Sequence, residues 1–455
     1  MRSFPFPSDL ILIAALCVTG CATLSNDHGF GNVKEATRTS IGKDIAWPRT
    51  DAEQAKVSEA VDSLLRQPID VEDAVQIALL NNKDLQGSFY DLGISEADMV
   101  QSSKLSNPKL SVLYAKHGED YKIEESLTFN ILSLVTMPKM REIQQQHYEA
   151  TKKSVTLKVV GLAYATRIAF FEAVSANESL NYAKQVMESA EASAEFARRM
   201  MLEGNWGKLE QERQQLFYED AKLEYSNTLN ERNARKERLS RLLGISADQL
   251  KLQDRLPSLP DTPPDDSLLG KDAFENRIDL IQKREETLIL AKQLGLSKTT
   301  RLINVLEIGP ARVLEGHRQD AYKNGVDLSF ELPLFDWGEA KVARAESIYM
   351  KSVNQTAQLA INARSEIRES FDNYATTYSI AKQYRDEIVP LRKKILDENQ
   401  LRYNGMLISP FELMAEARTQ VMSVNNYIAA LRNFWIADIK FKMALLGDTS
   451  GMDGD

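Results

Sequence analysis

The chain has 455 residues, of which 43% are hydrophobic and 27% charged, a composition that excludes wholesale disorder. Its formal net charge of -9 disfavours nucleic acid as a partner, because phosphate binding requires a basic surface. Both cysteines, Cys17 and Cys21, precede residue 22, so the remaining chain has neither a disulfide framework nor a thiolate metal site.

The N-terminus has the features of an export signal over residues 1–20. Arg2 precedes an apolar run, 10–16, that is too short for the roughly 20 residues of a membrane-spanning helix. The small residues before Cys21 resemble the lipobox of bacterial lipoproteins, in which the thiol is acylated (diacylglycerol, palmitate) and the cysteine becomes the new N-terminus. We therefore predict lipidation at Cys21. The alternatives are an ordinary signal peptide with an incidental cysteine and a cytosolic start.

The next segments are predicted to be a tether and then a helix. Residues 21–70 are treated as a polar, glycine-containing tether that follows the lipid. Residues 71–105 carry apolar residues at three- and four-residue spacing, which predicts a helix. Asn107-Pro108 ends it, because the residue before proline avoids helical geometry.

Two strands are predicted next, at about 109–115 and 123–135, separated by a turn at 118–120. Apolar and polar residues alternate in both, which indicates strands with two different faces. No later stretch reaches 18 unbroken apolar residues. Any membrane crossing is therefore expected to be made by strands.

A long helix hairpin, about 139–244, completes the first repeat, 71–250. Its first arm lacks proline up to residue 201 and would extend about 90 Å at about 1.5 Å per residue. The segment 204–207 breaks the helix. The second arm carries leucines at heptad spacing: Leu209, Leu216 and Leu223.

The second half of the chain repeats the first. A proline-rich linker, 251–270, leads into a second repeat over 271–447 and a flexible tail over 448–455. Its predicted elements are a helix, strands at about 302–313 and 325–334, and a hairpin at about 339–447. Matching residues recur at offsets of 195, 201 and 203: Asp84/Asp279, Gly204/Gly405 and Gly244/Gly447.

The last helix has the a/d periodicity of coiled-coil packing, with Trp435 predicted to be a core residue. Its seam comprises Ala417, Val421, Val424, Ile428, Leu431 and Trp435. Pro390 lies within the partner helix and is expected to kink or loosen it.

The strands impose a requirement on assembly. Four strands cannot close a barrel, since about eight are needed even for a packed interior. Exposed strand edges are not tolerated in lipid, so several chains must contribute to one barrel. Three chains would give about twelve strands. Alternate apolar residues are predicted to face lipid: Leu328, Phe330, Leu332, Leu127, Phe129 and Ile131.

Several motifs resemble those of TolC-like outer-membrane efflux proteins. Residues 328–338 (LSFELPLFDWG) resemble the family's exit from the last strand, and residues 402–409 (RYNGMLIS) resemble its hairpin turn. The helix endings at 239–244 and 444–447 also match. The resemblance covers about 70–447, and its specificity comes from the order of the two copies. The first strand exit, 131–138, departs from the pattern, and 204–207 is an unusual turn.

The resemblance implies a mainly α fold with a small transmembrane β part. It further implies a homotrimer whose 12-stranded β-barrel continues into a periplasmic α-helical barrel. The hairpin tips would narrow the periplasmic end and contact an adaptor (membrane fusion) protein that couples the channel to an inner-membrane pump. Tip and gate candidates are Glu398, Asn399, Arg402, Tyr403, Asn404, Gly405 and Glu412, with Gly204, Asn205, Trp206 and Gly207 at the first tip.

Simpler interpretations compete with these roles. The polar tip residues could form an ordinary solvated surface, and Gly204 and Gly405 are expected to supply positive-φ turns. Trp337 could anchor at a membrane–water boundary. The histidines show no ligand spacing and are expected at the surface: His28, His117, His147 and His317. We predict no metal site, no cofactor and no enzymatic activity, since the sequence contains no catalytic motif.

The sequence therefore predicts a lipid-anchored exit duct of a tripartite efflux system in the outer membrane, extending into the periplasm. Two alternatives stay open. One is the exit duct of a type I protein secretion system, and the other is a periplasmic coiled-coil scaffolding lipoprotein whose strands form no pore.

Overall fold

The computed structural model describes residues 23–265, 274, 277–317 and 319–447. The predicted signal peptide, Cys21 and the C-terminal tail lie outside these residues. The chain forms two compact units, each built from three separate stretches. The first unit comprises residues 1–33, 89–155 and 280–360, and the second comprises 34–88, 156–279 and 361–455.

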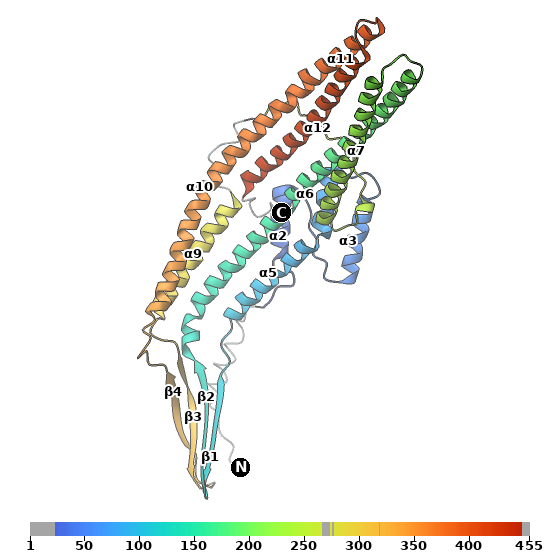
Figure 1. Ribbon diagram of the computed structural model, residues 1–455. Coiled ribbons are helices and arrows are strands. Elements are labelled where there is room, and N and C mark those ends of the chain that lie inside the picture. The colour runs from blue at the N-terminus through green and yellow to red at the C-terminus, as the bar shows by residue number, and fades with distance from the viewer. Residues whose placement is uncertain (1–22, 266–273, 275–276, 318, 448–455) are drawn as a thin grey trace. The chain divides into compact units, whose positions relative to one another are not determined.

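Helices dominate the described chain, and the strands occur as two hairpins far apart in sequence (Figure 1). The main elements in order are α2 (Phe30–Ile41), α3 (Asp51–Leu64), α4 (Val71–Asn81), α5 (Lys83–Ser102), β1 (Lys109–His117), β2 (Asp120–Asn130), α6 (Ile131–Leu202), α7 (Lys208–Leu243), α9 (Ile278–Thr299), β3 (Leu306–Gly316), β4 (Lys323–Phe330), α10 (Glu339–Gln383), a π-helical turn (Tyr384–Ile388), α11 (Val389–Asn404) and α12 (Pro410–Leu446).

The four strands form one antiparallel sheet in the order β1-β2-β3-β4. The central pair, β2 and β3, joins the two halves of the sequence, with Tyr121 opposite Gly316 and Asn130 opposite Glu307. Strands β1 and β4 each pair with one neighbour in the described chain, so both outer edges of the sheet lack a partner (Figure 1).

The strand ends differ from the sequence prediction. Strand β2 stops at Asn130, because the Asn130 side chain accepts a hydrogen bond from the Ser133 backbone N–H at 2.8 Å and so starts α6. The predicted strand residue Ile131 is therefore helical. Strand β3 begins at Leu306 rather than near 302, and β4 ends at Phe330, so Leu332 lies beyond it.

Helix α6 is 72 residues long and contains Pro138 within its early turns. Within the described residues, it is the helix that is long and apolar enough by composition to cross a membrane. However, 72% of its apolar window is buried, as in a core helix. Its residues Phe170 and Phe171 belong to the main core of the second unit, together with Leu239 and Phe434.

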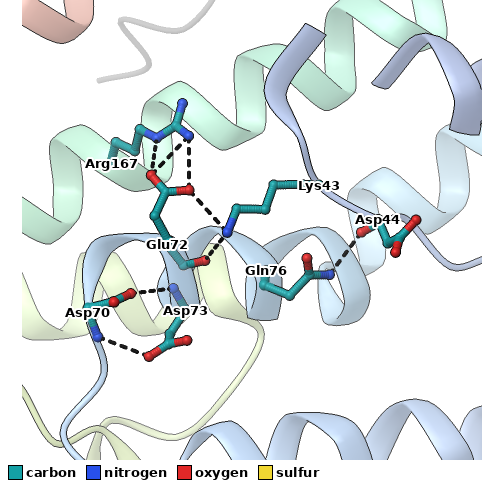
Figure 2. Close-up of polar contacts among 7 residues, drawn as sticks. All are labelled: Lys43, Asp44, Asp70, Glu72, Asp73, Gln76 and Arg167. Carbon is teal, nitrogen blue, oxygen red and sulfur yellow. Dashed lines mark hydrogen bonds and ion pairs between the residues drawn. The ribbon is translucent and has the colours of Figure 1, made fainter. Parts of the chain in front are cut away.

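Residues 21–70 are not a free tether over their described part. Helix α3 begins with a capping box between Thr50 and Glu53. Figure 2 shows the segment before it held against the helices of the second unit. The Glu72 carboxylate accepts Lys43 Nζ at 3.0 Å and Arg167 Nη2 at 3.1 Å, and Gln76 donates to the Asp44 carbonyl. Long-range ion pairs therefore fix this segment.

The described part of the proline-rich linker is also docked. Leu256 and Leu259 are buried in the core of the second unit. Trp435 Nε1 donates to the Pro257 carbonyl at 3.1 Å, and Tyr378 Oη donates to the Asp261 carbonyl at 3.2 Å. Trp435 is half-buried and packs against this core as predicted. Its ring nitrogen, however, forms a hydrogen bond with the linker.

The long helix of the second repeat is interrupted where the proline predicts it. The π-helical turn, Tyr384–Ile388, lies immediately before Pro390. Because proline removes a backbone donor, a local change of helical type relieves the mismatch. The expected loosening near Pro390 is confirmed.

Candidate channel surfaces and hairpin tips

One face of the sheet is apolar and exposed. Leu110 lies opposite Leu127, and Phe129 lies opposite Ile308, which in turn lies opposite Leu328. All five side chains are exposed. Since alternate residues of a strand share a face, these residues form a continuous apolar band across all four strands. The band is the feature expected of a lipid-contacting sheet.

The opposite face of the sheet is polar. Lys109 and Thr128 are opposite each other across β1 and β2, and the Lys109 ammonium pairs with the Glu307 carboxylate of β3. Asp327 and Ser329 continue this face on β4. The sheet therefore has one apolar face and one polar, charged face.

Aromatic and charged residues border the apolar band at both ends. Towards the β1–β2 turn, Tyr114 and Tyr121 lie 6.2 Å apart, and the Arg312 guanidinium pairs with Glu125. Beyond the other end of β4, Phe335 and Trp337 are exposed. Aromatic residues flank the apolar bands of membrane proteins in this way, so the placement of Trp337 fits a boundary anchor.

The second hairpin tip is turned by a residue that sequence reasoning did not select. Gly405 has a φ of -81°, so the prediction of a positive φ there is wrong. The left-handed residue is Met406, with φ 58°. Its N–H donates to the Tyr403 carbonyl, and the Leu407 N–H donates to the Arg402 carbonyl, which caps α11.

The first hairpin tip uses the same hydrogen-bond pattern. Gly204 has φ 74°, as predicted, and its N–H donates to the Met201 carbonyl, while Asn205 N–H donates to Met200. The structural equivalent of Gly204 is therefore Met406 rather than Gly405. Trp206 packs edge-on against Phe196, with ring centroids 5.7 Å apart. Gly207 is the N-cap of α7.

The polar tip candidates have mostly local partners. Arg402 pairs with Glu398 one helical turn away at 3.3 Å, and both are exposed. Glu412 forms a capping box with Ser409, which explains its presence by helix capping rather than gating. Asn404 accepts a hydrogen bond from Gln400, and Asn399 and Tyr403 are half-buried.

Exposed apolar residues at this tip were missed by sequence reasoning. Leu401, Met406 and Leu407 are all exposed, Met406 by 93%. Large apolar side chains beside a turn glycine were the available signal, because a solvated turn favours small polar residues. An exposed apolar cluster of this kind indicates a contact surface.

His28 differs from the surface residue that was expected. Its Nδ1 lies 2.6 Å from the buried Glu96 carboxylate, which also accepts the Ser25 backbone N–H at 2.9 Å. Burial opposes ionisation of Glu96, but these hydrogen bonds outweigh it and hold the pKa of the carboxyl below its ordinary value. Burial, with the Glu96 charge second, raises the pKa of Tyr148 to about 12. The described N-terminal segment is thereby fixed in the first unit.

The described residues contain no group of three or more His, Cys, Asp or Glu side chains placed to hold a metal ion.

Comparison with known proteins finds no matching family model and no matching curated protein. Solved structures do match. The Campylobacter jejuni CmeC outer membrane channel has a TM-score of 0.70 at 16% identity, covering 93% of this chain and 93% of that one.

The chain has the TolC-like channel fold. The Neisseria gonorrhoeae MtrE outer membrane channel gives a TM-score of 0.67 at 14% identity, covering 83% of this chain and 89% of MtrE. The Vibrio cholerae outer membrane protein VceC gives 0.65 at 12% identity, covering 87% of this chain and 97% of VceC. The TolC-like resemblance predicted from two copies of short motifs is confirmed at the level of the fold.

Proposed function

We propose that this protein is a subunit of an outer-membrane exit duct, in which three copies pool their strands into a 12-stranded barrel. The observation that carries the proposal is the four-stranded sheet with one apolar face, one charged face and two unpaired edges. An unpaired strand edge in lipid leaves backbone N–H and C=O groups without hydrogen-bond partners. Each such group costs on the order of several kcal/mol. Joining β4 of one copy to β1 of the next removes both edges.

The helices support the same assembly. Leu209, Leu216 and Leu223 of α7 are 56%, 61% and 63% exposed, although they have heptad spacing. The buried heptad positions of α7 are instead small or polar: Gln214, Ala221 and Thr228. A leucine ridge facing outward on a long helix is explained by packing against a second copy in a cylinder of helices.

The remaining parts of the proposal concern Cys21 and the second hairpin tip. Acylation at Cys21 would anchor the N-terminus in the outer membrane. The exposed apolar tip residues, Leu401, Met406 and Leu407, would contact a periplasmic adaptor, which links the duct to an inner-membrane pump. Tip ion pairs such as Arg402–Glu398 are worth about 0–1 kcal/mol, so a partner could rearrange them at little cost. Conduction through the duct would be passive.

The two alternatives differ from this proposal in identifiable ways. The exit duct of a type I secretion system would use the same barrel and differ in its cargo and pump. A scaffolding lipoprotein would need no amphipathic sheet, and the continuous apolar band argues against it.

Conductance across planar bilayers tests the proposal. Purified oligomers should give stable ohmic single-channel currents.

The matched pair Leu328→Arg and Ser329→Arg places the same charge on opposite faces of β4. We expect Leu328→Arg to block insertion, because arginine on a lipid face costs about 2–4 kcal/mol near the membrane midplane. Ser329→Arg should insert and alter the conductance. Silent bilayers from correctly folded wild-type oligomers would contradict the proposal.

A further inference from the structure

The two repeats leave the sheet in different ways. In the first repeat, α6 begins at Ile131, directly after β2 ends at Asn130. In the second repeat, a loop of residues 331–338 separates the end of β4 at Phe330 from the start of α10 at Glu339 (Figure 1). The exit from β4 therefore contains a loop that the exit from β2 lacks.

Backbone contacts fix both ends of this loop. The Glu331 N–H donates to the Val305 carbonyl at 3.3 Å, and the Gly338 N–H donates to the Asp336 carboxylate at 2.8 Å. Gly338 has a φ of 72°, and a Cβ there would lie 2.4 Å from the Arg301 carbonyl oxygen. Glycine is required for this close approach, so the loop is held against the segment that leads into β3.

The loop carries apolar side chains that its own chain leaves uncovered. Phe335 is 99% exposed, and Leu332, Leu334 and Trp337 are 59%, 68% and 60% exposed. Buried aromatic side chains are typical anchors of protein interfaces. An anchor that is already fixed loses little conformational entropy when it binds. The exposed Phe335 ring therefore has the features of an anchor for a partner.

The topology of the sheet indicates which partner this is. Strands β1 and β4 are the outer strands, and each has one neighbouring strand among the described residues. The other strand pairs are all antiparallel. If β4 of one copy pairs with β1 of the next in the same way, the end of β4 meets the start of β1. The loop then lies beside residues 103–108 of the next copy, which lead into β1.

An exposed apolar site lies at this part of the chain. Leu105 precedes β1, and Leu134 and Val135 lie in the first turns of α6. All three side chains are exposed, that of Val135 by 70%. The Ser106 hydroxyl donates to the Ser133 hydroxyl at 3.0 Å and joins the two segments. Residues before β1 and after β2 thus contribute to one apolar surface.

We propose that Phe335 of one copy packs against Leu105, Leu134 and Val135 of the next copy. This inference rests on the proposed assembly through β4 and β1 and adds a specific side-chain contact to it. The pair β2–β3 lies within one chain, whereas the pair β4–β1 joins separate chains. The loop therefore occurs at the one exit from the sheet where a second chain must be held.

Cross-linking between differently tagged copies tests this contact. Copies carrying Phe335→Cys and copies carrying Leu105→Cys are co-expressed, purified in detergent as mixed oligomers and oxidised. A disulfide requires Cα atoms within about 7 Å. We expect a linked species that contains both tags and disappears on reduction. Each variant expressed alone gives the background from Cys21.

Leu302→Cys provides the matched control. Leu302 precedes β3 as Leu105 precedes β1, and both side chains are exposed. However, β3 is paired with β2 of its own chain. We therefore expect no linked species between Leu302→Cys in one copy and Phe335→Cys in another.

Oligomer dissociation on dilution provides a second measurement that needs no cysteine. Phe335→Ala removes a ring that its own chain does not cover, so the fold of the single chain is expected to stay intact. It should raise the protein concentration at half-dissociation by about tenfold or more, because the buried ring is lost from each contact. Leu302→Ala should leave this concentration unchanged.

The outcomes separate this inference from the proposed function. Oligomers that conduct ions but give no linked species between Phe335→Cys and Leu105→Cys, with an unchanged half-dissociation concentration for Phe335→Ala, would overturn the contact alone. A ring that enters lipid instead would give this result. A wild-type chain that forms no oligomer would overturn both.

Discussion

Asn82 and Arg277 occupy equivalent places in the two repeats. Asn82 Nδ2 donates to the Leu242 carbonyl at 3.0 Å, and Arg277 Nη1 donates to the Ala444 carbonyl at 3.1 Å. Each acceptor lies in the last turn of the helix that ends its repeat, α7 or α12. In both repeats, a side chain near the start of the repeat therefore donates a hydrogen bond to a carbonyl in the last turn of its final helix. The donor is an amide in the first repeat and a guanidinium in the second.

Removing the Arg277 side chain should lower the free energy of unfolding more than a surface substitution in the same unit does. Arg277 is fully buried and binds both oxygens of Asp279 as well as Glu366 at 3.0 Å. Arg277→Ala would leave the Asp279 carboxylate buried without its cation, so we expect a loss of about 3–5 kcal/mol. Thermal unfolding followed by circular dichroism measures it. The control is Arg364→Ala on α10, which is exposed and should change the melting temperature little.

The N-terminal contact at Glu96 should depend on pH. The pKa of Glu96 is held below its ordinary value, about 4.5, so the ionised form stabilises the fold above that pH. This contribution is lost as the pH falls through the lowered pKa. The difference in melting temperature between wild type and Glu96→Gln should therefore be largest near pH 6 and shrink below pH of about 4.5. Asp98→Asn, an exposed position on α5, should show no such dependence, and a constant difference for Glu96→Gln would refute the argument.

Gly309 should tolerate no side chain. A Cβ at this position of β3 would overlap the Leu127 carbonyl oxygen of the adjacent strand. Gly309→Ala is therefore expected to destabilise the sheet by about 1–3 kcal/mol, the usual cost of overpacking. Gly325→Ala in β4 is the matched control, because a Cβ there meets nothing within 4 Å. The yield of heat-stable oligomer after reconstitution compares them, and similar yields would contradict the prediction.

Met406 is expected to lower the stability of the fold through its left-handed backbone and to contact a partner through its exposed side chain. A residue other than glycine in the left-handed region costs about 1–2 kcal/mol, so Met406→Gly should raise the melting temperature of the protein. Leu407→Gly removes a neighbouring exposed side chain and should give no such gain. If the proposed periplasmic adaptor docks at this tip, both variants are expected to weaken its binding in a pull-down assay. Unchanged binding by both would remove these side chains from the contact.

The features predicted well from sequence are those that periodicity determines. The alternation in 109–115 and 325–334 located one strand of each pair, because a period of two needs no information from distant residues. The long proline-poor stretch up to residue 201 predicted a helix of unusual length in the same way. The order of the two copies then sufficed to indicate the fold.

The errors arose where distant contacts decide the outcome. The segment 21–70 looked like a tether because its sequence is polar, whereas Glu72 and Arg167 supply the charges that hold it. The heptad spacing of Leu209, Leu216 and Leu223 does not show which face of α7 packs within the chain, and the structure buries Gln214 and Ala221 there. Met406 was overlooked because glycine next to it is the usual left-handed residue.

The direction of the outer strands has a consequence for subunit number. All neighbouring strands in the sheet are antiparallel and their number is even, so β1 and β4 run in opposite directions. Any whole number of copies could therefore join edge to edge with regular hydrogen bonds. Pairing alone does not set the stoichiometry. The bend of each sheet and the angle between neighbouring helices must set it, so a substitution that alters the bend is expected to change the number of subunits while every strand pair stays intact.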